Sequence, residues 1–163
     1  MAGHARTLLG TREAAGPANN GTILGWAKRL GVKVLGIAYN ADSTPWCGLF
    51  VANCLREAGV DLEAMKVGVR ASAWATWGAN LRADRLAPGA ILVFSREGGG
   101  HVGFYVGEDA TTYSGLGGNQ GDRVSIARVA KNRCVARRWP KGVALIGKPI
   151  VLASTGAVST NEA

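Results

Sequence analysis

The order of the sequence patterns predicts an α+β protein, in which N-terminal helices pack on a small antiparallel β-sheet. Apolar residues at helical spacing are confined to the first half of the chain, up to about residue 77. Short apolar runs between glycine-rich turns follow in the second half. Because the change from helix to strand patterns occurs once, the sequence favours α+β over an alternating α/β arrangement.

The length of 163 residues and the lack of internal repeats predict one domain. We expect it over residues 1–145. A flexible tail is expected over residues 146–163, since the chain from about Leu152 onward is rich in alanine, serine and threonine.

Two helices are expected before residue 40. The first covers residues 5–15 and is ended by the turn-forming residues 16–21. The second runs from Thr22, a candidate N-cap, to Leu30, and Gly31 follows its end.

The clearest helix of the sequence begins at Cys47, after a loop of turn formers that includes Pro45. It runs to Ala58 with an apolar stripe at helical spacing, and Gly59 is a natural residue to follow its end. A further short helix is expected over residues 71–77, where two tryptophans lie three positions apart.

The second half is interpreted as strands. Residues 90–94 form a continuous apolar run, which suits a strand buried on both faces, although periodicity alone also allows a short helix. Residues 101–106 follow a glycine-rich connection and are the expected hairpin partner. One or two more short strands are expected within residues 113–129.

The formal net charge of +8 favours anionic partners such as nucleic acid, an acidic membrane surface or a wall that carries anionic polymers. A solvated basic face is the alternative, and both interpretations stay open at this point. Lysine and arginine are not interleaved with aromatic residues, so nucleic acid is not expected as a partner. Many of the basic residues come late: Arg123, Arg128, Lys131, Arg133, Arg137, Arg138 and Lys141.

The three cysteines are not expected to form a disulfide framework. An odd number leaves at least one free thiol within a single chain. Cys47 and Cys54, if they share a helix, are about 10 Å apart along its axis, which is too far for a disulfide. No Cys/His spacing resembles a zinc site, and no metal or other cofactor is expected.

The sequence contains no recognisable signal peptide or membrane span. The first residues lack an apolar core segment, and no stretch reaches the roughly 20 apolar residues that cross a bilayer. We expect synthesis in the cytoplasm and no stable membrane insertion.

Cys47 is the candidate nucleophile. At the start of a helix, exposed backbone N–H groups and the helix dipole favour a thiolate. The N–H of Cys47 could also contribute to an oxyanion hole. Cysteines are more often structural, and Cys54, on the apolar stripe, is interpreted in that way.

His101 is the candidate base. Strand alternation places His101 and Gly103 on one face and Val102 on the other. An imidazole in this role needs an orienting partner. A carboxamide from Asn119 or Gln120, within a glycine-rich segment, could accept a hydrogen bond from the ring, although Asn119 can equally be a turn residue.

Taken together and in order, these motifs resemble the NlpC-type and CHAP-type papain-like hydrolases, and in particular a phage-associated, endolysin-like branch. The similarity extends over roughly residues 5–140. The segments that carry it are Asn19, Asn20, Ile23 and Trp26, the nucleophile segment 44–51 (TPWCGLFV), the strand 88–94, the histidine strand 99–107 (GGHVGFYVG), and segments 117–120 and 138–140.

The resemblance implies a papain-like core and a catalytic order that falls on Cys47, His101 and Asn119, with Gln120 as the fallback. It implies cleavage of an amide bond of bacterial peptidoglycan, in the stem peptide or at the muramoyl–alanine link, by a phage or prophage lysin. Such an enzyme would act at the cell wall after release from the cytoplasm. The sequence departs from the family pattern at Gly48, where many relatives carry serine or alanine.

Substrate contacts are expected from five residues, namely Asp42, Trp46, Trp74, Gly100 and Gln120. Trp77 is a further candidate to line the groove, but a core position is at least as expected for the three tryptophans, and a loop-capping role is the more expected one for Asp42. Three other functions stay open: a non-catalytic basic wall-binding or structural phage module, a thioester acyltransferase on the same fold, and a toxin delivered into a rival cell. A monomer is expected.

Overall fold

The computed structural model describes residues 2–14, 19–42, 44–153, 157–160 and 162. Three α-helices come first: α1 (Ala2–Thr7), α2 (Gly21–Leu35) and α3 (Cys47–Glu57). Short 3₁₀ helices lie at η1 (Ala71–Thr76), η2 (Ala83–Arg85) and η3 (Lys131–Arg133). The strands are β1 (Ala79–Asn80), β2 (Ile91–Arg96), β3 (Gly99–Glu108), β4 (Thr112–Gly117), β5 (Ser125–Ala130), β6 (Cys134–Trp139) and β7 (Val158–Ser159).

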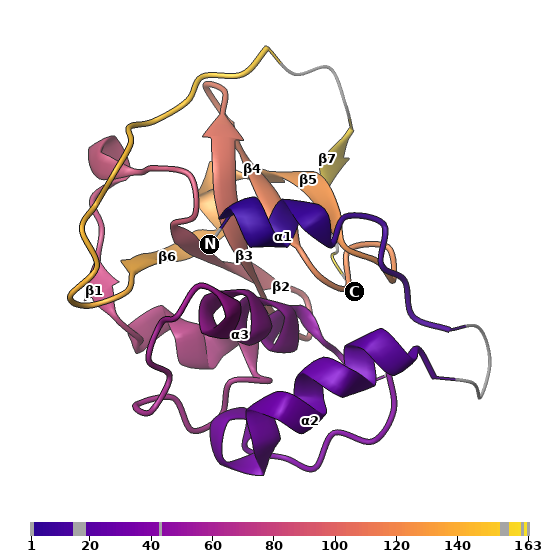
Figure 1. Ribbon diagram of the computed structural model, residues 1–163. Helices are drawn as coiled ribbons and strands as arrows, with labels where there is room; N and C mark the ends of the chain where they lie inside the picture. Colours follow the sequence, from indigo (N-terminus) through magenta and orange to yellow (C-terminus); the bar gives the residue numbers. More distant parts are fainter. Residues whose placement is uncertain (1, 15–18, 43, 154–156, 161, 163) are drawn as a thin grey trace.

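The strands form one sheet in the order β1-β6-β2-β3-β4-β5-β7. Neighbouring strands are antiparallel except β5 and β7, which are parallel, so the sheet is mixed and larger than expected. Figure 1 shows α1 and α3 on one face of the sheet, with α2 beyond α3. The α+β class with N-terminal helices on a sheet is therefore confirmed.

Each face of the sheet buries its own core. On the helical face, Val102 and Phe104 of β3 pack with residues of α3 such as Phe50, whose ring centroid lies 6.1 Å from that of Phe104. On the opposite face, Tyr105 and Tyr113 belong to a second apolar cluster. The alternation along β3 agrees with the sequence pattern and fixes the orientation of the histidine strand.

The first two helices differ from their expected bounds. α1 ends at Thr7 rather than near residue 15, because Gly10 adopts a left-handed φ of 89° and Arg12 pairs with Arg123 in an isolated bridge. Residue 15 itself lies outside the described residues. α2 continues past Gly31, which has non-helical angles and kinks the helix.

Asn20, and not Thr22, caps the N-terminus of α2. Its side-chain oxygen accepts hydrogen bonds from the N–H groups of Thr22 and Ile23, at 2.7 and 3.3 Å. An asparagine before the first helical turn satisfies donors that the helix cannot pair itself. The expected cap at Thr22 is therefore wrong by two positions.

Strand β6 lies in the late basic stretch, where no strand was expected from the sequence. Its arginines are bound to neighbouring backbone. Arg138 Nε donates to the carbonyl oxygen of Trp77 at 2.7 Å, and its Nη2 donates to that of Gly78 at 2.8 Å. Part of the late positive charge thus stabilises the sheet edge.

Ion pairs use further late basic residues. Arg128 pairs with Asp109 at 2.8 Å and Lys131 pairs with Glu108 at 3.2 Å. These ion pairs indicate that late basic residues stabilise the fold, which argues against a continuous charged binding face.

The described part of residues 146–163 lies against the sheet at several points. The N–H of Leu152 donates to the carbonyl oxygen of Glu108 at 2.7 Å, β7 pairs with β5, and Glu162 forms an ion pair with Arg133 at 2.6 Å. The flexible tail stays a prediction, although these residues hold parts of it in place. Within the described part of the chain, no helix combines the length and apolar character needed to cross a bilayer.

Candidate active site

Cys47 is the first residue of α3, and Trp46 precedes it as the N-cap residue. The side chain is buried. Burial raises the pKa of the Cys47 thiol, while the backbone N–H groups of Val102 and Gly48 and the positive charge of Arg96 act in the opposite direction. Because Val102 directly follows His101, the thiol lies against the histidine strand β3.

Gly48 departs from the family pattern for a steric reason. An added Cβ would overlap the carbonyl oxygen of Gly68 and lie 2.7 Å from that of Val69. The Gly68 carbonyl is held in place by a 2.9 Å hydrogen bond from the indole N–H of Trp74. The close approach of this loop to the first turn of α3 therefore requires glycine at position 48.

His101 lies on β3 opposite Phe94 of β2, and only 2% of it is exposed. Its Nε2 is 2.8 Å from Oε1 of Gln120, and its ring stacks on Phe94 with an interplanar angle of 18°. The carboxamide of Gln120 is itself fixed, since its Nε2 donates to the carbonyl oxygens of Ser125 at 2.6 Å and Gly115 at 3.3 Å. Oε1 is thus the atom that faces the ring.

The orientation of Gln120 determines the tautomer of His101. A carbonyl oxygen can only accept, so Nε2 carries the proton and Nδ1 is left as the basic nitrogen. Gly117 permits this contact, because an added Cβ there would lie 2.9 Å from Gln120 Oε1 and 3.1 Å from His101 Nε2.

The choice of Asn119 as the third residue is corrected by this geometry. Gln120, the fallback, contacts the ring. Asn119 adopts a left-handed φ of 62° and turns the chain after β4, which matches its alternative interpretation as a turn residue.

The electrostatics favour a neutral Cys47 and a neutral His101. Burial lowers the pKa of His101, and the positive charges of Arg96 and Arg133 lower it further. The carboxylate of Glu162 and the hydrogen bond to Gln120 act in the opposite direction. In this conformation, burial thus acts against the charged form of both side chains.

The carboxylate of Glu162, which acts on the charge of His101, was not expected from the sequence. The Glu162 carboxylate is buried and accepts from both terminal nitrogens of Arg133, at 2.6 and 3.0 Å, and from the hydroxyl of Ser159 at 2.6 Å. Nothing in the sequence pattern connects Glu162 with a histidine 61 positions earlier.

A groove of about 490 Å³ opens beside Cys47. Its walls come from Val69, Arg70 and the first turn of η1 on one side, and from the β2–β3 hairpin, including Arg96 and Gly100, on the other. The expected substrate contact Gly100 thus lies where a substrate would reach Cys47. Arg96 is a groove residue that was not among the expected site residues, although its place just before the glycine-rich hairpin turn was a usable signal.

Three of the expected substrate contacts are instead structural. Trp46 and Trp74 are fully buried, and the indole N–H of Trp46 donates to Glu13 at 3.1 Å. Asp42 is also buried and accepts from the N–H groups of Ala14 and Asn20 at 2.7 and 2.6 Å. Their polar atoms are engaged within the protein, so the expectation that they contact substrate is not met.

The remaining cysteines lie apart from this arrangement. Cys54 is buried in the core cluster on the helical face, and burial raises the pKa of its thiol. Cys134 is partly exposed in β6. All three cysteines are free thiols, and among the described residues no three histidine, cysteine or acidic side chains group as a metal site would require.

A comparison with protein families finds a match to the CHAP domain over residues 39–119. The matched segment contains Cys47 and His101 and ends one residue before Gln120. Neither the curated proteins nor the solved structures give a match to the chain. The resemblance to CHAP-type papain-like hydrolases is thereby confirmed, while the phage-associated branch stays a prediction.

Proposed function

Residues 39–119 of this chain belong to the CHAP domain family, and from this we propose that the protein is a cysteine hydrolase that cleaves an amide bond of bacterial peptidoglycan. The family membership indicates a peptidoglycan hydrolase in general. The observation that supports the mechanism best is the locked imidazole of His101, whose Nε2 faces Gln120 at 2.8 Å and whose strand lies against the Cys47 thiol.

In the proposed reaction, Nδ1 of His101 takes the proton of the Cys47 thiol as the sulfur attacks the amide carbonyl carbon. The backbone N–H of Cys47, at the start of α3, donates to the developing oxyanion. Collapse of the tetrahedral intermediate breaks the C–N bond, and His101 returns the proton to the leaving amine. A water molecule, deprotonated by His101, then hydrolyses the thioester and releases a carboxylate and the free thiol.

Gln120 acts in this scheme as an orienting residue. It keeps the ring N–H on Nε2 in both protonation states, because its own amide nitrogen is held by two backbone carbonyls. When His101 becomes positively charged, Nε2–H still donates to the Gln120 oxygen, so this hydrogen bond persists through the proton transfer.

Both amide bonds suggested by the resemblance, in the stem peptide and at the muramoyl–alanine link, remain part of the proposal. So do the role as a phage or prophage lysin and action at the wall after release from the cytoplasm. A monomer that does not bind nucleic acid is also proposed. The alternative of a basic wall-binding module is weakened, because Arg128, Arg133 and Arg138 are bound to acidic side chains or backbone.

The proposal is tested by the loss of turbidity of purified peptidoglycan, with mass spectrometry of the released fragments. We expect digestion by the wild type and by Cys134→Ser, which changes a cysteine that is not among the groove-lining residues, and none by Cys47→Ala or His101→Ala. New amine ends locate the bond that is cut. Equal behaviour of all four proteins on several wall types would exclude the hydrolase.

A further inference from the structure

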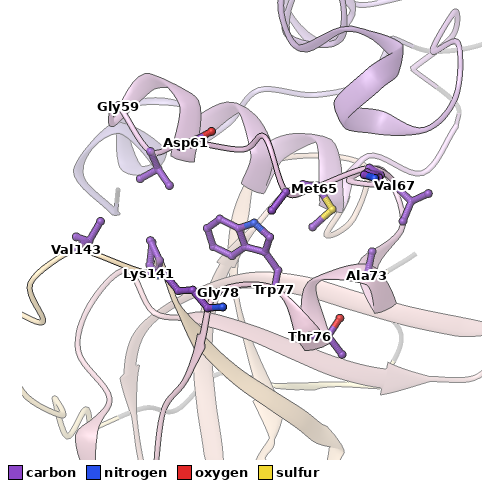
Figure 2. Close-up of a pocket in the computed structure, with 14 residues that line it drawn as sticks. Gly59, Asp61, Met65, Val67, Ala73, Thr76, Trp77, Gly78, Lys141 and Val143 are labelled. Atoms are coloured by element: carbon purple, nitrogen blue, oxygen red, sulfur yellow. The ribbon is translucent and has the colours of Figure 1, made fainter.

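A second hollow, of about 700 Å³, lies on the other side of η1 from the groove at Cys47. Figure 2 shows it, with side chains from the segment after α3, from η1 and from the segment after β6 around its rim. Its volume is within the range of roughly 300–1,000 Å³ that is usual for small-ligand sites. The proposed catalytic mechanism does not use this hollow.

The two hollows share η1 as a common wall. Ala71 and Ser72 line the groove, whereas Ala73 and Thr76 line the second hollow. At about 2 Å per residue, the six residues of η1 extend only about 12 Å. One extended ligand can therefore reach from the second hollow to the groove.

Trp77 is the central residue of the second hollow. Figure 2 shows its indole ring in the middle of the hollow, with Met65 on one side and Lys141 and Val143 on the other. Trp77 is only 9% exposed as a residue, and its ring packs edge-on against that of Trp74, with centroids 5.2 Å apart.

The indole N–H of Trp77 has no acceptor among the residues that the structure describes, unlike those of Trp46, Trp74 and Trp139. This N–H group is not among the buried unpaired side-chain atoms of the described residues, so it is open to the hollow, where water or a ligand can accept from it. A ligand in the hollow that offers a carbonyl oxygen next to an apolar group would satisfy this donor.

The other residues that line the hollow indicate which chemical groups such a ligand would carry. Met65, Val67 and Val143 provide apolar surface next to the indole. Lys66 and Lys141 are donors and Asp61 is an acceptor, and all three are exposed at the rim, where they can exchange hydrogen bonds with hydroxyl groups. An aromatic platform, a small apolar recess and mixed polar groups suit a sugar that carries an acetamido group.

We propose that this hollow binds an N-acetylated amino sugar of the glycan strand while the attached peptide enters the groove at Cys47. The acetyl carbonyl accepts from the indole N–H of Trp77, and the acetyl methyl group packs on Met65 and Val67. The assignment of this ligand to peptidoglycan rests on the proposed function, whereas sugar binding itself can be measured without catalysis.

The experiment uses the full chain with Cys47→Ala, labelled with ¹⁵N-tryptophan, and two disaccharide probes. One is β-1,4-linked di-N-acetylglucosamine, and the other is cellobiose, which lacks the acetamido groups. The chain has five tryptophans, and the indole signal of Trp77 is identified by its loss in Trp77→Phe. We expect the first probe to shift this signal in a saturable way, and cellobiose to leave it in place.

Two variants test the contacts. Trp77→Phe keeps an aromatic ring against Trp74 but removes the donor, and Lys141→Met removes a rim charge. Each is expected to weaken binding of the acetylated probe about fivefold, as for the loss of one hydrogen bond. Lys148→Met, which lies outside the hollow, is the matched control and is expected to bind as the parent does.

In the active enzyme, the same two variants are expected to raise KM for peptidoglycan and leave kcat unchanged. The absence of a saturable Trp77 shift, an equal shift with cellobiose, or unchanged affinity in both variants would overturn the sugar site. Because binding is measured in the Cys47→Ala protein, sugar binding without wall digestion by the active enzyme would contradict the proposed function and leave the sugar site standing.

Discussion

Replacing Gln120 by methionine should slow the enzyme strongly while Asn119→Gly should not. Methionine fills a similar volume but can neither accept from the His101 ring nor donate to the carbonyl oxygens of Ser125 and Gly115. Asn119→Gly removes the neighbouring carboxamide and keeps the left-handed turn, because glycine tolerates the φ of 62°.

The size of the expected loss of activity in Gln120→Met follows from the burial of the His101 ring. Leaving the Nε2–H of His101 without an acceptor costs about 1–3 kcal/mol. If this penalty falls on the conformation that catalyses, kcat/KM decreases about 5- to 150-fold, at about 1.4 kcal/mol for each factor of ten. The rate for Asn119→Gly should stay within about threefold of the wild type, since its side chain does not contact the ring.

The assay is the initial rate of peptidoglycan digestion, with thermal unfolding measured on each variant so that a folding defect is recognised. A further variant, Gln120→Asn, keeps the carboxamide but shortens the side chain, and should fall between the wild type and Gln120→Met. An unaffected Gln120→Met, or an Asn119→Gly that loses as much activity, would refute the assignment of the ring partner.

Two further predictions concern packing and titration. Gly48→Ala should lower the free energy of unfolding by about 1–3 kcal/mol, because the new methyl group overlaps the Gly68 carbonyl. The control is Gly25→Ala in α2, where a Cβ has room. Equal free energies of unfolding for the two variants in a denaturant titration would contradict the steric argument. Since burial lowers the pKa of His101, the neutral base persists below the usual histidine value of about 6.5, and the acid limb of the pH–rate profile should lie below that pH. Glu162→Gln removes a carboxylate that raises the pKa of His101, so both this limb and the NMR titration of the ring should move to lower pH, and movement to higher pH would contradict the account.

The catalytic helix and the histidine hairpin could be predicted because their signals are local. The helix from Cys47 has an apolar stripe at helical spacing, and Gly59 follows it with a left-handed φ of 80°. The residues 90–94 and 101–106 contain enough alternating or continuous apolar residues to define β2 and β3. Family resemblance then linked these two elements in one site, and the CHAP match agrees with it.

The features that were missed depend on contacts between distant residues. Strand β6 is rich in arginine, and its place in the sheet is stabilised by bonds to backbone such as Arg138 to Trp77, 61 positions earlier. The choice between Asn119 and Gln120 depends on one left-handed residue, which decides which side chain faces the ring. Spacing along the sequence cannot resolve two adjacent carboxamides.

The roles of the tryptophans likewise depend on the three-dimensional structure. Trp46, Trp74 and Trp77 all seemed able to contact substrate, but the first two are fully buried with bonded N–H groups. Only Trp77 reaches a hollow with an unpaired donor among the described residues, and that hollow lies outside the catalytic groove. Aromatic composition alone gave no means of separating these roles.

The most direct test of the central claim is the intact mass of the protein, quenched with acid during digestion of peptidoglycan. The account predicts an added acyl fragment, mapped by peptide sequencing to Cys47, that appears with the wild type and with Cys134→Ser and is absent from Cys47→Ala. The mass of the fragment identifies the bond that is cut. Digestion of the wall by Cys47→Ala would contradict the account.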